Sequence, residues 1–207
     1  VFPLLLVIAI AIYSTNVNTT LNNLGSKSKY DPQKELIQNS DNGKTIVDDP
    51  IDVIARQWNW EFIYPEGFSS SELHLPINKK VNFRLISKDV IHGFYIPAFR
   101  LKQDIIPGSI ISYSLTPTRT GVYRLRDSMF SGAYFSQNQT NVIVESKDSY
   151  KQWINKTVKK VPVSGLNQAG ILYQKRLENG DRGWATVPPT ASPMVNDPGD
   201  YKQPHEG

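Results

Sequence analysis

The sequence predicts an all-β domain, built as an antiparallel sandwich or barrel, with segments of different character at both ends. Short runs rich in Val, Ile, Phe, Tyr and Trp recur between residues 51 and 146, and turn residues separate them. The chain has 14 prolines and 13 glycines, many of which lie at the ends of these runs. A hydrophobic content of 39% in 207 residues is enough for one core of ordinary domain size.

Each run is favourable for a strand because β-branched and aromatic side chains pack well on a pleated, half-buried surface. Prolines at positions 65, 76, 97, 107 and 117 lie at the ends of runs or between them, where they break the hydrogen-bonded ladder. Regular spacing of short strands is typical of sandwiches and barrels. The predicted strands are Val53–Tyr64, Ser71–Leu75, Lys80–Ser87, Val90–Ile96, Ile110–Thr116, Gly121–Arg126 and Thr140–Ser146.

Residues 1–13 are continuously apolar. As a helix they would extend about 20 Å, whereas the hydrocarbon core of a bilayer is ~30 Å thick. A signal-peptide core or a buried strand are the alternatives, but a basic start and a small-residue cleavage site are missing. We expect the outer part of a transmembrane helix, in a sequence that is incomplete at its N-terminus. The first Lys or Arg is Lys27, which suits the non-cytoplasmic side of a membrane.

The remaining segments carry weaker patterns. Residues 14–50 are rich in Asn, Ser, Thr, Lys and Asp and predict a polar linker. Residues 147–180 predict a helical extension, with one amphipathic helix in Lys147–Lys160 and a second helical turn or two in Leu166–Glu178. Residues 181–207 form a tail rich in Pro and Gly that cannot build its own core, so we expect it to be disordered or to lie along a partner.

The net charge is +4 and the isoelectric point is about 9.1, but basic and acidic residues are interspersed. No Lys/Arg block of the nucleic-acid type occurs, so we expect no nucleic-acid partner. The sequence also lacks a glycine-rich phosphate loop, a nucleophile elbow and the spacing of a zinc site. We therefore expect no catalytic residue, no bound cofactor and no metal ligand in this chain.

Three motifs carry a resemblance to a known family. Arg56 to Phe62 read R-Q-W-N-W-E-F, Asp89 to Gly108 read D-V-I-H-G-F-Y-I-P-A-F-R-L-K-Q-D-I-I-P-G, and Gly121 begins G-V-Y. Together with the Leu75–Pro76 strand opening, they resemble subunit II of haem–copper terminal oxidases, over roughly residues 1 to 146. The resemblance implies a cupredoxin-like Greek-key β-barrel.

Copper-bearing members of that family continue with C-S-E-x-C-G-x-x-H-x-x-M, which provides most ligands of a dinuclear copper centre. Here both cysteines, the second histidine and the methionine are replaced, and the chain contains no cysteine. Copper electron-transfer centres need thiolate ligands. The degenerate positions are His92, Asp127, Met129, Ser131, Phe135 and Asn138.

Of the side-chain ligands only His92 survives, and a single imidazole is more often structural than metal-binding. We expect it to bond a nearby polar group, with Asp127 as a candidate partner. Phe135 is predicted to fill the space that an imidazole and a metal occupy in the family. Met129 stands where the family has a glutamate that binds magnesium, and a thioether is a poor ligand for that hard cation.

Four further residues are candidates for contacts with other subunits. In copper-bearing members the counterpart of Trp58 lies where cytochrome c delivers its electron. Trp58 and Trp60 would share one strand face, and in the absence of copper packing is the safer assignment for both, with a subunit contact as the alternative. Arg124 and Arg126 lie beside the degenerate positions and would either face solvent or bind haem propionates or carboxylates of subunit I.

The resemblance implies a non-catalytic, structural subunit of a membrane oxidase that reduces oxygen, without a copper relay and with quinol as electron donor. Haem and copper would belong to subunit I, subunit III would be a further partner, and quinol would bind in a partner subunit. The membrane would be the bacterial cytoplasmic or thylakoid membrane, with the barrel on the periplasmic or lumenal side. Quinol oxidases of the bo type and the cyanobacterial alternative respiratory terminal oxidase have such subunits. A cytochrome c oxidase subunit 2 with a degenerate copper site, or a stand-alone cupredoxin-like binding module, are the alternatives.

Overall fold

The computed structural model describes residues 6–16, 49–181 and 187–200, in two units that divide between residues 42 and 43. In the first unit residues 6–16 are helical, and their apolar side chains are exposed. Among the described residues, no helix combines the length and the apolar character that crossing a membrane requires. The expected outer part of a membrane helix stays a prediction, and the calls for residues 17–48 lie outside the described part of the chain.

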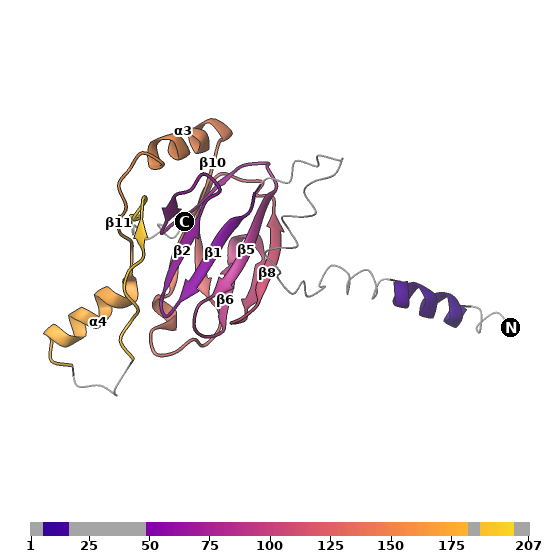
Figure 1. The fold of residues 1–207 in the computed structure, drawn as a ribbon. Helices are drawn as coiled ribbons and strands as arrows, with labels where there is room; N and C mark the ends of the chain where they lie inside the picture. The colour runs from indigo at the N-terminus through magenta and orange to yellow at the C-terminus, as the bar shows by residue number, and fades with distance from the viewer. Residues whose placement is uncertain (1–5, 17–48, 182–186, 201–207) are drawn as a thin grey trace. The chain divides into compact units, whose positions relative to one another are not determined.

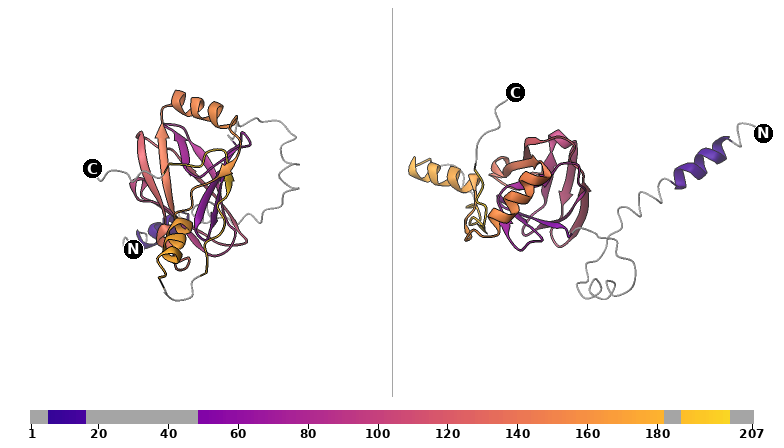
Figure 2. Two further views of the ribbon diagram at one scale, coloured as in Figure 1. Left: turned by 90° about the vertical axis from the view of Figure 1, so that its left-hand side faces the viewer. Right: turned by 90° about the horizontal axis from the view of Figure 1, so that it is seen from above.

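The second unit is a barrel of two five-stranded sheets that face each other (Figures 1 and 2). One sheet has the order β3-β2-β1-β5-β8, and the other has the order β4-β10-β9-β6-β7. The first contains β1 (Ile51–Arg56), β2 (Asn59–Ile63), β3 (Ser69–Ser70), β5 (Val81–Ser87) and β8 (Ile110–Leu115). The second contains β4 (Leu73–Pro76), β6 (His92–Ile96), β7 (Leu101–Ile105), β9 (Gly121–Asp127) and β10 (Gln139–Glu145).

Most strand pairs are antiparallel, but two are parallel. β1 runs parallel to β5, and β4 runs parallel to β10. The prediction of a purely antiparallel arrangement is therefore wrong, although the all-β class is confirmed. Two sheets that exchange strands through such crossovers are typical of a Greek-key barrel, in which the chain returns to a sheet it has left.

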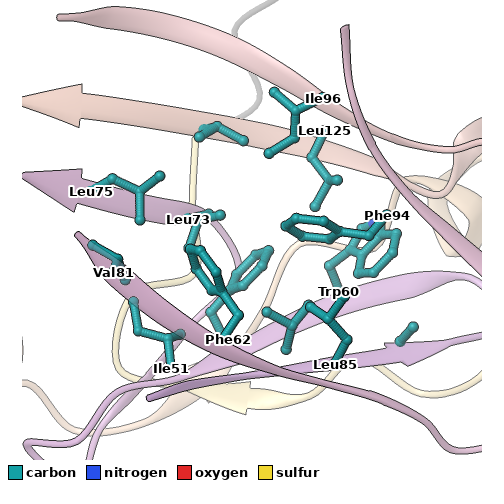
Figure 3. Packing of buried hydrophobic residues seen from close by; sticks show 14 of the residues in the cluster. Ile51, Trp60, Phe62, Leu73, Leu75, Val81, Leu85, Phe94, Ile96 and Leu125 are labelled. Carbon is teal, nitrogen blue, oxygen red and sulfur yellow. The ribbon is translucent and has the colours of Figure 1, made fainter. Parts of the chain in front are cut away.

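The core lies between the two sheets and follows the period-two pattern of the strands. In β5 buried and half-buried residues alternate along the whole strand, and Phe83 and Leu85 point inward. Figure 3 shows side chains of both sheets packed against one another, with Phe62 and Leu85 from one sheet and Phe94 and Leu125 from the other. Burying one such side chain stabilises the fold by roughly 1.5–3 kcal/mol.

One predicted strand is divided in the structure, and β7 was missed. The run Val53–Tyr64 is not one strand, because Gln57 and Trp58 form a turn between β1 and β2. Trp58 and Trp60 therefore do not share a strand face: Trp60 belongs to the main core, and Trp58 to a second cluster. β7 was not predicted, because its alternation of Leu101 and Ile105 with polar residues is too sparse to stand out from a loop.

Helix α3 (Lys147–Thr157) begins after an N-cap at Ser146, whose hydroxyl accepts a hydrogen bond from the Ser149 N–H at 3.1 Å. It lies across one end of the barrel (Figure 2). Trp153 packs edge-on against Tyr64 and Phe68 and stacks on the His74 ring. We call this end of the domain the α3 end. The opposite end carries the loop Ser128–Asn138, and we call it the loop end.

Helix α4 (Gln168–Glu178) follows a short strand, β11 (Val163–Ser164), and is longer than the turn or two that the sequence predicted. The described part of the tail is not free. β12 (Met194–Val195) pairs with β11, and the next residues continue the first sheet through hydrogen bonds with Ser69 and Ser71. Residues 187–200 thus lie along the barrel of their own chain, because extended backbone with unpaired N–H and C=O groups can extend a sheet edge.

Candidate functional site

The residues at the degenerate copper positions lie at the loop end, where β6, β9 and the loop Ser128–Asn138 meet. His92 is the first residue of β6 and Asp127 the last of β9, and the antiparallel pairing of these strands places Phe94 opposite Asp127. Gly93 allows the loop to approach closely, because a Cβ atom there would lie 2.1 Å from Ser128 Oγ. The strands therefore position both ionisable side chains before the loop adds its own.

The His92 ring is fully buried between two carboxylates. Its Nδ1 lies 2.6 Å from Asp127 Oδ2, and its Nε2 lies 2.7 Å from Asp89 Oδ1. The expected pairing with Asp127 is thus present. Asp89 was not recognised from the sequence, although an aspartate three residues before the histidine was a signal that the two side chains could meet.

Asp127 accepts hydrogen bonds at both oxygens. Oδ1 accepts from the backbone N–H groups of Gly93 at 2.7 Å and Met129 at 3.0 Å. Oδ2 accepts from the Ser131 hydroxyl at 2.8 Å and the Asn138 amide at 3.1 Å, in addition to His92. The side chains that replace the family's two cysteines and its methionine are therefore gathered into one hydrogen-bonded cluster around the surviving histidine.

Charge pairing determines the protonation of this cluster. Burial alone would lower the pKa of His92, but the hydrogen bonds to Asp127 and Asp89 outweigh burial and raise it to about 9. Burial alone would raise the pKa of each aspartate, but the bond from His92 and the bonds from backbone N–H groups lower both. At neutral pH the cluster is an imidazolium held between two carboxylates.

The pH dependence of stability follows from these directions. The folded-state pKa of His92 lies above its ordinary value of 6.5, so its contribution is complete below that value and is lost as the pH rises through about 9. The aspartates contribute to stability above their ordinary pKa of 3.8 and lose that contribution as the pH falls below it.

We expect the urea midpoint to drop between about pH 7 and about pH 10 in the parent and to change less in His92→Gln. Parallel pH profiles of the two proteins would contradict this.

The loop is fixed by hydrogen bonds from both tryptophans of the sequence motif. Trp58 Nε1 donates to the Ser131 carbonyl at 3.0 Å, and Trp60 Nε1 donates to the Asn138 carbonyl at 3.1 Å. Gly132 has a φ of +115°, and a Cβ there would lie 2.7 Å from the Trp58 ring. Packing, the safer assignment for the two tryptophans, is thus what the structure shows, and neither ring is available on the surface of this chain.

Phe135 does not fill the space beside His92 as predicted. It is half-buried, and its ring contacts that of Phe130 at a centroid distance of 5.3 Å. Tyr134 is the buried aromatic residue of the loop and packs edge-on against Trp58 at 5.2 Å. The space next to the imidazole holds Asp127 and Asn138 instead, which hydrogen-bond to the ring and to each other.

The other site residues are placed as follows. Met129 is half-buried and contributes its backbone N–H to the cluster. Arg126 is exposed and Arg124 half-buried, on the outward face of β9. Their contacts with subunit I stay predictions. Within the described residues, no group of three or more His, Asp or Glu side chains is arranged to hold a metal ion.

A family model for the periplasmic domain of cytochrome c oxidase subunit II matches residues 66–147. By this match, residues 66–147 belong to the cytochrome c oxidase subunit II family. The match contains both the strands and the loop that form the cluster around His92. The mainly β architecture and the subunit II motifs of the sequence therefore agree.

Two curated relatives and one solved structure show how the subunit II match extends. Cytochrome c oxidase subunit 2 of Thermostichus vulcanus is 39% identical over 104 residues, which are 50% of this chain and 32% of that protein. Cytochrome bo(3) ubiquinol oxidase subunit 2 of Buchnera aphidicola subsp. Baizongia pistaciae is 28% identical over 160 residues, which cover 76% of this chain and 51% of that protein. The chain thus spans from about a third to about half of the length of these relatives.

The periplasmic domain of subunit II of cytochrome oxidase from Bradyrhizobium japonicum has a similar fold. Its crystal structure aligns with a TM-score of 0.50 and 24% identity, over 53% of this chain and 92% of that one. The likeness confirms the cupredoxin-like fold of the subunit II domain.

Proposed function

We propose that this chain is subunit II of a membrane haem–copper terminal oxidase that has no dinuclear copper centre and accepts electrons from quinol. The subunit II domain itself is established by the family match. Relatives in the same family include a subunit of a ubiquinol oxidase, which supports the quinol assignment. The chain would be a structural, non-catalytic part of an oxidoreductase.

The observation that carries the proposal is the chemistry of the His92 cluster. A copper ligand must offer a lone pair, and copper electron-transfer centres require thiolate sulfur. Both nitrogens of His92 face carboxylates, and both oxygens of Asp127 accept hydrogen bonds from groups of the protein. The residues present do not fit the copper centre that the family implies, and we assign no electron-transfer step to this domain.

The environment of Trp58 also supports a donor other than cytochrome c. The resemblance implies that electrons enter copper-bearing members at the counterpart of this residue. Here the ring is 1% exposed, and it packs against Tyr134 and Ala169, the latter from α4. A soluble electron carrier would meet α4 at this place, whereas a membrane quinol delivers its electrons within the membrane subunits.

The remaining assignments follow from this proposal. Haem and copper would lie in subunit I, quinol would bind in a partner subunit, and subunits I and III would be the protein partners. The barrel would stand on the periplasmic or lumenal side of the bacterial cytoplasmic or thylakoid membrane. Met129 in place of a carboxylate would remove the contribution of this subunit to a magnesium site.

The test is the electron donor of the complex that co-purifies with this chain. We expect oxygen consumption with a quinol and almost none with reduced cytochrome c, and no visible or near-infrared bands of a thiolate-bound copper pair. Metal analysis of the separately purified chain is the control for copper in other subunits. Efficient oxidation of cytochrome c by a preparation without other copper proteins would refute the proposal. Absence of a haem-bearing partner would favour a stand-alone binding module.

A further inference from the structure

The two ends of the barrel differ in the character of their surfaces. At the loop end the exposed side chains include Ile91, Ile106 and Phe130, the last being 80% exposed. At the α3 end the exposed charged side chains of the described residues are mainly basic. At that end the Asn78 N–H, in the connection from β4 to β5, donates a hydrogen bond to the Pro117 carbonyl after β8 at 2.8 Å.

The basic residues of the α3 end come from loops that converge there and from α3 with the turn after it. All of them are exposed, and they are Lys79, Lys80, Arg100, Arg119, Lys147, Lys151, Lys156 and Lys159. We call this set the basic surface. They outnumber the exposed carboxylates of the same end in the described residues, which are Asp49, Glu66 and Asp148. Among the described residues, the exposed charge at this end of the barrel is thus predominantly positive.

The outward face of α3 is polar because its apolar face is used within the domain. Tyr150, Trp153 and Ile154 pack on the barrel core, whereas Lys151 in the helix and Lys159 in the turn after it are exposed. A helix that binds at a lipid surface inserts its apolar face among the acyl chains. Within Lys147–Thr157 no large apolar side chain is exposed, and the exposed Val158 and Val161 follow the helix. The lysines of α3 therefore suit an electrostatic contact with a folded protein better than insertion into a membrane.

We propose that the basic surface is a docking site for a protein that presents an acidic face. Complementary charge of this kind speeds encounter and selects partners, and its effect weakens as salt screens it. The loop end, with its apolar residues, remains available for a different contact, so the domain would have two separate interaction surfaces. This inference does not depend on the electron donor of the oxidase.

The test uses the full 207-residue chain in a non-ionic detergent, with fluorescent poly-L-glutamate as the acidic probe. We expect binding at about 20 mM salt that weakens strongly at about 300 mM, as for a contact between exposed charges. The double substitution Lys151→Glu/Lys159→Glu, which we call the α3 variant, should weaken low-salt binding by at least about tenfold. The matched control Lys88→Glu/Lys175→Glu makes the same change in net charge away from the basic surface and should change binding less than about twofold.

A second pair, Lys80→Glu/Arg119→Glu, reverses charge in two loops of the basic surface and should reproduce the loss. It also keeps the test decisive if the α3 variant does not fold, which its thermal unfolding curve would reveal. If the control and the α3 variant lost binding of poly-L-glutamate equally, the proposal would be overturned, because the probe would then respond to the net charge of the chain alone. Tighter binding to phosphatidylglycerol vesicles than to poly-L-glutamate, abolished by the α3 variant, would overturn it in favour of a lipid partner.

Discussion

Asp127→Ala is expected to lower the free energy of unfolding by about 3–5 kcal/mol, because it leaves a buried imidazolium and several buried donors without their shared acceptor. The carboxylate accepts bonds from Gly93, Met129, Ser131, Asn138 and His92. Removing it therefore frees the loop from β6 and β9 at the same time. Urea unfolding followed by tryptophan fluorescence measures the loss.

Asp52→Ala is the matched control. This carboxylate also accepts two hydrogen bonds from one cation, with Arg84 Nε and Nη2 at 2.5 and 2.6 Å, but the pair lies near the surface. Exposed ion pairs contribute about 0–1 kcal/mol, so its removal should have a small effect. If Asp127→Ala were as mild as Asp52→Ala, the cluster around His92 would not be what holds the loop.

Tyr134→Ala is expected to cost about 3–5 kcal/mol, as for other buried aromatic residues, and Phe135→Ala distinctly less. Tyr134 is 2% exposed and contacts the Trp58 ring. It connects the loop to α4 through the Tyr173 ring and through Arg176, whose guanidinium lies 5.4 Å from the tyrosine ring centroid. Loss of the tyrosine ring should also let water reach Trp58 and shift its fluorescence to longer wavelength.

Phe135→Ala is the natural comparison, since it removes a neighbouring aromatic side chain that is only half-buried. The informative result is which of the two substitutions lowers the free energy of unfolding more. A larger loss for Phe135→Ala than for Tyr134→Ala would restore the sequence-based prediction that Phe135 fills the metal position, and it would contradict the packing described here.

Much of the fold was open to prediction from local pattern. Alternation in Val81–Ser87 and Gly121–Asp127, with prolines between the runs, indicates strands because period two is the signature of a half-buried sheet. The turn at Gln57–Trp58 was missed, because the run from Val53 to Tyr64 contains no Gly or Pro to mark a reversal. The parallel pairs β1–β5 and β4–β10 were missed for another reason: strand pairing is set by contacts between residues far apart in the chain.

The candidate site, like the fold, was predictable from the sequence only in part. The absence of cysteine and the replacements at Asp127, Ser131, Phe135 and Asn138 are properties of the sequence alone, because the chemistry of a copper thiolate centre depends on residue type. Which residues would take the place of the metal was decided by the tertiary structure. Asp89 reaches His92 only because the turn before β6 brings the two together, and Tyr134 rather than Phe135 is buried because α4 covers that side of the loop. Such choices depend on the free energy of burying charge and aromatic area against segments far along the chain, which no local pattern contains.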